Sequence, residues 1–359
     1  MKSTIIKRAK WTATCLLISL AALFLVACEE NDNDPLPAPT DPYASGTFVL
    51  NEGPFTSGSG SLSHVDEKGQ VVNEAFFLAN GFPLGSVLQS AELVGDELYI
   101  VANLSGRIEV VQKGTLNALR STQLLGSPRY VQELSDGRVA ATDWATDKVY
   151  VLNASDLSLS QSFDAGVGPE RMAVLGDRLY VLNSGGFGRD STVHIIHIAS
   201  DSVMGQMVIG DQPNSLQVIQ GRIWVLCSGY ADWSDPSNDT QGKLLEMDAD
   251  GQILSEYPID LSIGHPGELI HDQQNNRLCF LNNAYGGSIM AIDLSAPESF
   301  FELKKGSYYS LDHDPIRGQI VAGNALSFDV PGYMIRFGSD MSLVDSVQVG
   351  LIPTDFIFH

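Results

Sequence analysis

The chain has 359 residues, with 21 Lys and Arg against 43 Asp and Glu and a formal net charge of −22 at pH 7. An excess of acid on this scale argues against nucleic acid and anionic lipid surfaces as partners, because both are themselves negatively charged.

The first ten residues carry four basic side chains and no acidic one, and an apolar run from Trp11 to Ala27 follows. This layout predicts a secretory signal peptide over residues 1–27. A transmembrane helix is the alternative, but a run of about 17 residues is at the short limit for spanning a bilayer. The run ends in Leu-Val-Ala-Cys at Cys28, which resembles the lipobox of bacterial lipoproteins. We therefore expect cleavage before Cys28 and attachment of lipid to its thiol, which would give stable anchoring.

Residues 28–44 are expected to form a tether. Acidic and amide side chains fill positions 29–34, and four prolines follow before Tyr43. A segment of this composition cannot bury apolar surface. The acidic cluster directly after Cys28 resembles the surface-export signal of Bacteroidetes lipoproteins, and a solvated spacer is the alternative. The expected location is the outer membrane, with the protein exposed at the cell surface.

A repeat begins after the tether. Its clearest part is an apolar strand that usually follows a glycine turn, and seven copies start near Thr47, Glu97, Arg138, Arg178, Arg222, Arg277 and Gln319. The copies recur about every 40 to 55 residues, which is typical of a β-propeller. These strands are apolar at nearly every position, as expected where both faces are buried. No helical periodicity competes after Tyr43. Residues 45–359 are therefore predicted to form an all-β, seven-bladed β-propeller.

The two ends of the repeat region predict how the propeller closes. The chain starts at the second strand of a blade, and its last segment, Pro353–His359, matches the first strands that begin at Pro128, Pro169 and Pro213. The C-terminal strand is therefore expected to pair into the N-terminal blade and so to cover open strand edges.

Two cysteines, Cys227 and Cys279, lie in the predicted propeller. A disulfide would suit an exported protein. Their positions in the repeat differ by three residues, or roughly 10 Å along a strand, which is too far for a bridge. Buried free thiols are expected.

Aromatic side chains recur in the loop between the second and third strands, in six of the seven repeats. They are Phe55, Trp144, Phe187, Tyr230, Trp233, Tyr285 and Phe328. In a propeller these loops share one end of the central channel with the corners between blades, and the corners supply Arg129, Tyr130, Arg171 and Tyr308 among others. Such a ring predicts a binding face for a large, flat ligand. Individual aromatics could instead pack on their own blade.

Catalytic and metal-binding patterns are weak. His194 and His197 are three apart on a strand and point to opposite faces. The acidic loop from Asp232 could hold Ca²⁺, but its spacing matches no known calcium loop, and solvated acids are favoured. The sequence therefore predicts neither an enzyme, nor a metal site, nor a resident cofactor.

The repeats "VYVLNAS" at Val149 and "LYVLNSG" at Leu179 resemble those of YVTN-type, YncE-like propellers. The opening "FVLNEGPFTSGSGSLSHVD", followed by "LVGDELYIVANLSGRIEVV", is similar to Bacteroidetes lipoproteins of the DUF5074 group, which includes BtuG-type surface proteins. The resemblance spans Gly46 to His359. It implies capture of a corrinoid such as cobalamin, and handover to a TonB-dependent outer-membrane transporter.

Two other functions remain open from the residues. One is a structural or protein-interaction propeller in an outer-membrane complex, for which the same loop face would serve. The other is a propeller enzyme of the lactonase or lyase type, which would need a metal ion or an acid/base pair in the channel.

Overall fold

The computed structural model describes residues 41–359 except Ser57, Leu124, Tyr285 and Glu298. Asp41–His359 form one compact unit, which includes the last residues of the segment assigned to the tether. The expected signal peptide, Cys28 and the rest of the tether lie outside the described residues. No helix in the described part of the chain is long and apolar enough to cross a membrane.

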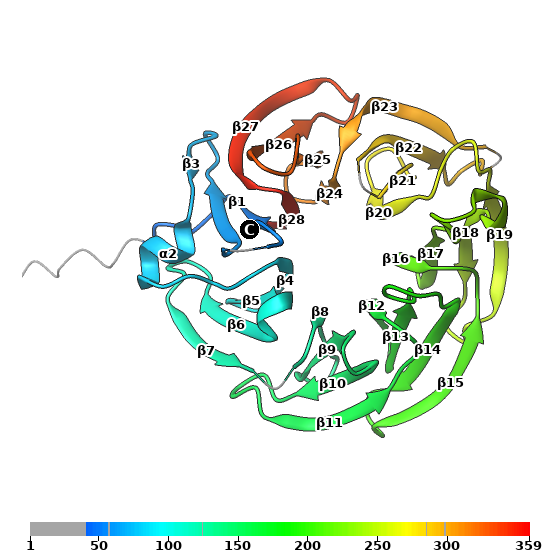
Figure 1. Ribbon diagram of the computed structural model, residues 1–359, viewed down its shortest axis with the longest axis horizontal. Coiled ribbons are helices and arrows are strands. Elements are labelled where there is room, and N and C mark those ends of the chain that lie inside the picture. The colour runs from blue at the N-terminus through cyan, green and yellow to red at the C-terminus, as the bar shows by residue number, and fades with distance from the viewer. Residues whose placement is uncertain (1–40, 57, 124, 285, 298) are drawn as a thin grey trace, which may run out of the picture. The chain divides into compact units, whose positions relative to one another are not determined.

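The compact unit is a ring of seven four-stranded antiparallel sheets, or blades, as predicted (Figure 1). From the inner to the outer edge, the first four blades are β28 (Pro353–Phe358), β1 (Thr47–Asn51), β2 (Ser61–Val65) and β3 (Val71–Val72); β4 (Leu88–Val94), β5 (Glu97–Ala102), β6 (Arg107–Gln112) and β7 (Ala118–Thr122); β8 (Pro128–Glu133), β9 (Val139–Asp143), β10 (Lys148–Leu152) and β11 (Leu159–Asp164); and β12 (Pro169–Leu175), β13 (Arg178–Asn183), β14 (Thr192–His197) and β15 (Ser202–Val208).

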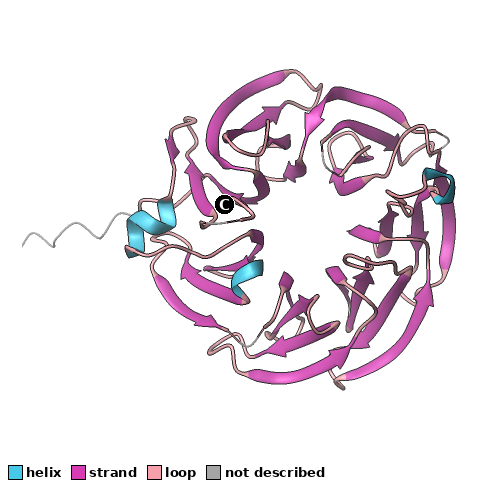
Figure 2. Ribbon diagram, in the orientation of Figure 1, coloured by secondary structure: helices cyan, strands magenta, loops and turns pink. Residues whose placement is uncertain are grey.

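The remaining three blades repeat this order. They are β16 (Pro213–Ile219), β17 (Arg222–Cys227), β18 (Gly242–Met247) and β19 (Ile253–Ile259); β20 (Gly267–Asp272), β21 (Arg277–Leu281), β22 (Gly287–Asp293) and β23 (Phe301–Tyr308); and β24 (Ser310–Asp314), β25 (Gln319–Asn324), β26 (Pro331–Phe337) and β27 (Leu343–Leu351). Strands account for nearly all the regular structure of the described chain (Figure 2).

The second strand of each blade is apolar throughout because its two faces serve two different cores. In β5, Leu98 and Ile100 pack toward blade 1 in one cluster, while Tyr99 and Val101 pack toward blade 3 in another. Seven such clusters of described residues lie at the seven blade-to-blade interfaces. Burial on both faces removes the alternation that a half-exposed strand would show.

The C-terminal strand closes the ring, as predicted. β28 pairs with β1 in antiparallel register from Thr47 opposite Phe358 to Asn51 opposite Pro353. Phe356 then packs with Val49 in the cluster between blades 7 and 1. We call β28 and its contacts the clasp. Both ends of the compact unit therefore meet in blade 1.

One helix departs from the sequence expectation. β3 has only two residues, and α2 (Ala75–Asn80) follows it on the outer side of blade 1. Two one-turn 3-10 helices, η1 (Asn103–Ser105) and η2 (Pro236–Asn238), lie in loops. No pattern in the sequence indicated α2, because six residues are too few to establish a helical period.

The two propeller cysteines are free and buried, as predicted. Burial in the apolar blade interfaces raises the pKa of each of the two thiols, Cys227 and Cys279, to about 12. A thiol held in this form is a poor nucleophile and behaves as a small apolar side chain.

Candidate functional site

The loops after the second strands and the corners before the first strands lie at the same end of the ring. Backbone hydrogen bonds join the two sets blade by blade: the amide of Trp144 donates to Ser127 O, that of Ser184 to Gly168 O, and that of Ser228 to Gln212 O. We call this end the loop face. Its corners lead directly into the inner strands, which surround the centre of the ring in Figure 1.

Buried amide and carboxylate side chains hold the corners in place. Asn103 donates to Pro128 O and Ser127 Oγ, while the Asp143 carboxylate accepts the amides of Gly126 and Ser127. Asp143 is the last residue of β9, whereas Asn103 directly follows β5. Polar side chains at the ends of these two second strands therefore fix the corners relative to the strands.

Most of the predicted aromatics do reach the loop face, and several are open to solvent. The exposed fractions of the side chains are 63% for Phe55, 103% for Phe187, 85% for Trp233 and 41% for Phe328. Tyr285 lies outside the described residues. Large apolar side chains that gather in exposed positions commonly mark an interaction surface.

Phe328 also carries backbone strain. It adopts a φ of 65°, in the left-handed region that residues other than glycine rarely occupy. Such strain persists where the surroundings enforce it and is concentrated at functional sites. Its ring meets that of Tyr309 edge-to-face with centroids 5.4 Å apart.

Trp144 is held from two sides. The Arg129 guanidinium carbon lies 3.9 Å from the centre of the Trp144 ring, and Phe187 meets that ring edge-to-face at 5.5 Å between centroids. The Trp144 Nε1 donor is buried and has no acceptor among the described residues. The stack fixes one aromatic plane from blade 3 beside an exposed ring from blade 4.

A second cation–aromatic stack lies on blades 4 and 5. The Arg189 guanidinium carbon is 4.7 Å from the centre of the Tyr230 ring, and Arg189 donates to both carboxylate oxygens of Asp211 at 3.1 and 2.6 Å. Asp211 also accepts a hydrogen bond from Thr240. Arg189 was not among the predicted site residues, although it belongs to the same loop as Phe187.

The corner residues form a charged network below the aromatics. Arg129 makes a two-pronged pair with Glu170, with donor–acceptor distances of 3.2 and 2.9 Å, and it also donates to Gln89. Arg171 pairs with Glu268 at 2.7 Å, although their strands β12 and β20 belong to blades 4 and 6 with blade 5 between them. This pair therefore links two blades that are not adjacent.

Further polar side chains extend the network around the channel. Tyr130 lies below the Arg171 guanidinium, which is 4.7 Å from its ring centre. Tyr309 donates to Glu52 Oε2 at 2.8 Å and thereby joins blade 7 to blade 1. Sequence reasoning missed Glu52 and Gln89. Both were visible as polar residues next to the aligned corners and second-strand ends.

Tyr308 does not join this surface. Its side chain is buried in the cluster between blades 6 and 7 and meets Phe337 edge-to-face at 5.9 Å between ring centroids. It ends the outer strand β23, whereas its neighbour Tyr309 reaches the network. The structure thus brings Arg129, Tyr130 and Arg171 together, and puts Tyr308 in the core.

Carboxyl groups deeper in the channel have raised pKa values. Burial raises the pKa of Asp312 to about 8 and that of Asp355 to about 6, and each feels other carboxylates nearby. Burial, with the neighbouring Asp355, likewise raises the pKa of Glu92 to about 8. The acids outnumber Arg171, the cation that faces them. Among the described residues, no three His, Cys, Asp or Glu side chains are arranged to hold a metal ion.

We expect the free energy of unfolding to fall between pH 7 and pH 9. A carboxyl with a raised pKa keeps its proton in the folded chain after the unfolded chain has lost it. Its stabilising contribution is therefore complete below the unfolded pKa, near 4, and is lost as the pH rises through the folded value. The stabilising contributions of Asp312 and Glu92 should each fall by about 1 kcal/mol over this interval. Urea denaturation at several pH values measures the effect.

The matched variants are Asp312→Asn and Glu92→Gln, which should flatten the pH dependence above pH 7. The surface variant Asp340→Asn should leave it unchanged, because Asp340 lies in an exposed turn. Histidines do not titrate in this pH range, because burial lowers the pKa values of His271 and His313 further below it. An unaltered slope in both channel variants would contradict the assignment.

Comparison with known proteins adds a family and a fold. The model of the family described as "Domain of unknown function (DUF5074)" matches residues 45–230. No curated protein sequence matches the chain.

Solved structures of similar fold include a quinoprotein alcohol dehydrogenase-like protein from Bacteroides thetaiotaomicron, with a TM-score of 0.67, 11% identity, and coverage of 88% of this chain and 78% of that one. A putative 6-phosphogluconolactonase from Bacteroides fragilis has a TM-score of 0.64 at 12% identity, with 91% and 100% coverage. Dihydro-heme d1 dehydrogenase NirN in complex with DHE has a TM-score of 0.59 at 13% identity, with 89% and 76% coverage. At these identities the likeness shows the fold alone.

Proposed function

Because the chain belongs to the DUF5074 family of β-propellers, we propose that it is a lipid-anchored surface protein that captures a large, flat ligand on its loop face. The proposed ligand is a corrinoid such as cobalamin, and the proposed recipient is a TonB-dependent outer-membrane transporter. The role is binding and delivery rather than catalysis.

The observation that carries the proposal is the exposure of aromatic rings around a fixed polar centre. Phe187 and Trp233 are almost fully exposed, and Phe55 and Phe328 are open as well. Beside them, Arg129 and Arg189 are already aligned by carboxylates and aromatic rings. A wide ring system with polar amide groups at its edge, as in a corrin, would match rings that offer apolar contact and guanidinium groups that offer hydrogen bonds.

The expected location follows from the sequence. Basic residues, an apolar run and the Leu-Val-Ala-Cys segment at Cys28 support lipidation, and the acidic residues after Cys28 support export to the surface. A binding protein held beside an importer would raise the local concentration of captured ligand at that importer.

We expect the purified mature protein to retain cyanocobalamin through gel filtration at micromolar protein, as followed by the red absorbance of the ligand. The double variant Phe187→Ala/Trp233→Ala should weaken binding at least about tenfold, because each exposed aromatic contributes roughly 1 kcal/mol of contact with a flat ligand. Titration calorimetry of both proteins gives the dissociation constants.

The control is Phe301→Ala, which removes an exposed aromatic from the outer strand β23, away from the loop face. Its affinity should equal that of the unmodified protein. Failure of the unmodified protein to retain cyanocobalamin would reject the corrinoid. Co-purification of a transporter without any corrinoid would favour the protein-interaction role instead.

A further inference from the structure

Helix α2 occupies the outer side of blade 1 in place of a full fourth strand. Ala75 and Phe76 face the core between blades 1 and 2, and Asn80 pins the end of the helix. The Asn80 side chain donates to Leu116 O at 2.8 Å and accepts the Ala118 amide at 2.8 Å, so that the helix is fixed to the outer edge of blade 2.

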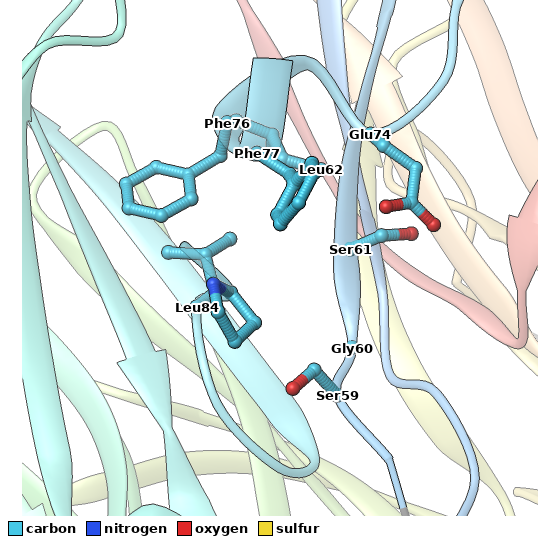
Figure 3. A pocket seen from close by; sticks show the side chains of 9 residues that line it. Ser59, Gly60, Ser61, Leu62, Glu74, Phe76, Phe77 and Leu84 are labelled. Atoms are coloured by element: carbon cyan, nitrogen blue, oxygen red, sulfur yellow. The ribbon is translucent and has the colours of Figure 1, made fainter. Parts of the chain in front are cut away.

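The other side of the helix exposes apolar side chains. The exposed fractions are 46% for Phe77, 66% for Leu78 and 40% for Phe82, and Leu119 on the adjacent β7 is 46% exposed. We call these four residues the rim patch. Phe77 also borders a cavity of about 200 Å³ with Leu62 and Leu84 (Figure 3). Because Asn80 fixes the helix to β7, the helix holds these apolar side chains in a defined arrangement.

The segment that contributes Phe77, Leu78 and Phe82 carries no charged side chain. No charged residue occurs between Glu74 and Glu92, although the chain as a whole has a formal net charge of −22. Exposed apolar patches on soluble proteins mark contacts with a partner or a membrane. A cationic partner would gain little from these apolar side chains, whereas apolar side chains suit the acyl boundary of a bilayer.

The chain enters the propeller beside this helix. The Tyr43 amide donates to Gly114 O at 3.0 Å in the turn between β6 and β7, and the Tyr43 ring belongs to the same core cluster as Phe76 and Leu84. Between Cys28 and Asp41 there are 12 residues, which span at most about 45 Å. A lipid on Cys28 would therefore hold the rim patch at high effective concentration near the membrane.

We propose that the rim patch rests in the interface of the lipid bilayer, with Phe77, Leu78 and Phe82 among the headgroups and upper acyl chains. This inference rests on the lipid anchor in the proposed function. The patch adds a second, reversible contact to the covalent anchor. It holds the propeller by the rim at blades 1 and 2, so that the loop face stays free of lipid.

The test uses the lipidated mature protein in neutral phosphatidylcholine vesicles, with an environment-sensitive fluorophore on Leu78→Cys. A matched protein carries the fluorophore on Leu343→Cys, a 61% exposed position on β27. Native Cys227 and Cys279 are buried and should stay unlabelled. Nitroxide-bearing lipids should quench the label at position 78 about threefold or more above the label at 343, with a blue-shifted emission. Adding Phe77→Ser and Phe82→Ser should remove the difference.

Other outcomes overturn the inference. Equal quenching at the two positions shows that lipid does not reach the patch. A blue shift at position 78 without quenching shows that a second copy of the protein covers the patch, and sedimentation of unlipidated Cys28→Ser protein checks for this self-association. Cyanocobalamin binding, measured on the same vesicles, distinguishes failure of the patch from failure of ligand capture. Absence of lipid on Cys28 by mass spectrometry overturns the anchor and this inference together.

Discussion

Removal of residues 353–359 is expected to abolish the cooperative thermal transition of the propeller. The lost strand, β28, supplies the inner edge of blade 1 and pairs with every residue of β1. Its side chains Phe356 and Ile357 are buried in two different blade interfaces. The deletion also breaks contacts to both neighbouring blades, since Ser310 Oγ donates to Pro353 O and the Ala91 amide donates to Asp355.

The loss should be large because the deletion opens the ring rather than shortening an edge. Removal of a buried Phe side chain alone costs about 3–5 kcal/mol, and the free edge of β1 would be left unpaired. Differential scanning calorimetry and near-ultraviolet circular dichroism measure the outcome. The control lacks only His359, which stacks on Phe48 at 4.3 Å between ring centroids, and it should still melt cooperatively. A truncated chain with an unchanged melting temperature would show that the clasp is dispensable.

The variant Arg129→Ala is expected to lower the free energy of unfolding by about 3 kcal/mol, because it leaves a buried carboxylate without its cation. Glu170 is 8% exposed, and burial already raises its pKa, while Arg129 opposes that rise. The same substitution removes the guanidinium from the face of Trp144 and from Gln89. Urea denaturation at pH 7 measures the change.

A second substitution separates charge from packing. Arg129→Ala/Glu170→Gln should recover part of the loss, because the uncharged amide no longer needs a cation. The control is Arg189→Ala. It should change the free energy of unfolding by less than about 1 kcal/mol, because Arg189 pairs with Asp211 while its own side chain is 48% exposed. Equal losses of unfolding free energy in Arg129→Ala and Arg189→Ala would mean that the buried Arg129–Glu170 pair stabilises the fold no more than an exposed ion pair does.

The architecture was predictable because a local pattern repeats. Leu98, Tyr99, Ile100 and Val101 are all apolar because neighbouring blades take alternate side chains. The similarity of Pro353–His359 to the other first strands predicted the closure for the same reason. Helix α2 escaped prediction because it occurs once, so no second copy in the sequence draws attention to it.

The site was predictable in outline and not in detail. The loop aromatics were identified because their position in the repeat fixes which end of the ring they occupy. Tyr308 and Tyr309 show the limit, because Tyr308 ends β23 and Tyr309 lies in the corner after it, so that a one-residue error exchanges core and channel. Arg129 was recognised as a channel residue, but its pairing with Glu170 depends on side chains from two blades. Glu92 and Asp312 carried a signal, because both are acids within inner strands.

The clasp has a consequence for the order in which the parts of the propeller fold. Thr47 lies near the beginning of the compact unit and pairs with Phe358, the penultimate residue of the chain. Contacts between such distant parts of a chain form slowly and late. Blades 2 to 7 each consist of four consecutive strands and can form from their own segments, whereas blade 1 needs β28 from the far end of the propeller. The propeller therefore stays open until β28 has paired with β1, and a chain without β28 exposes the unpaired edge of β1.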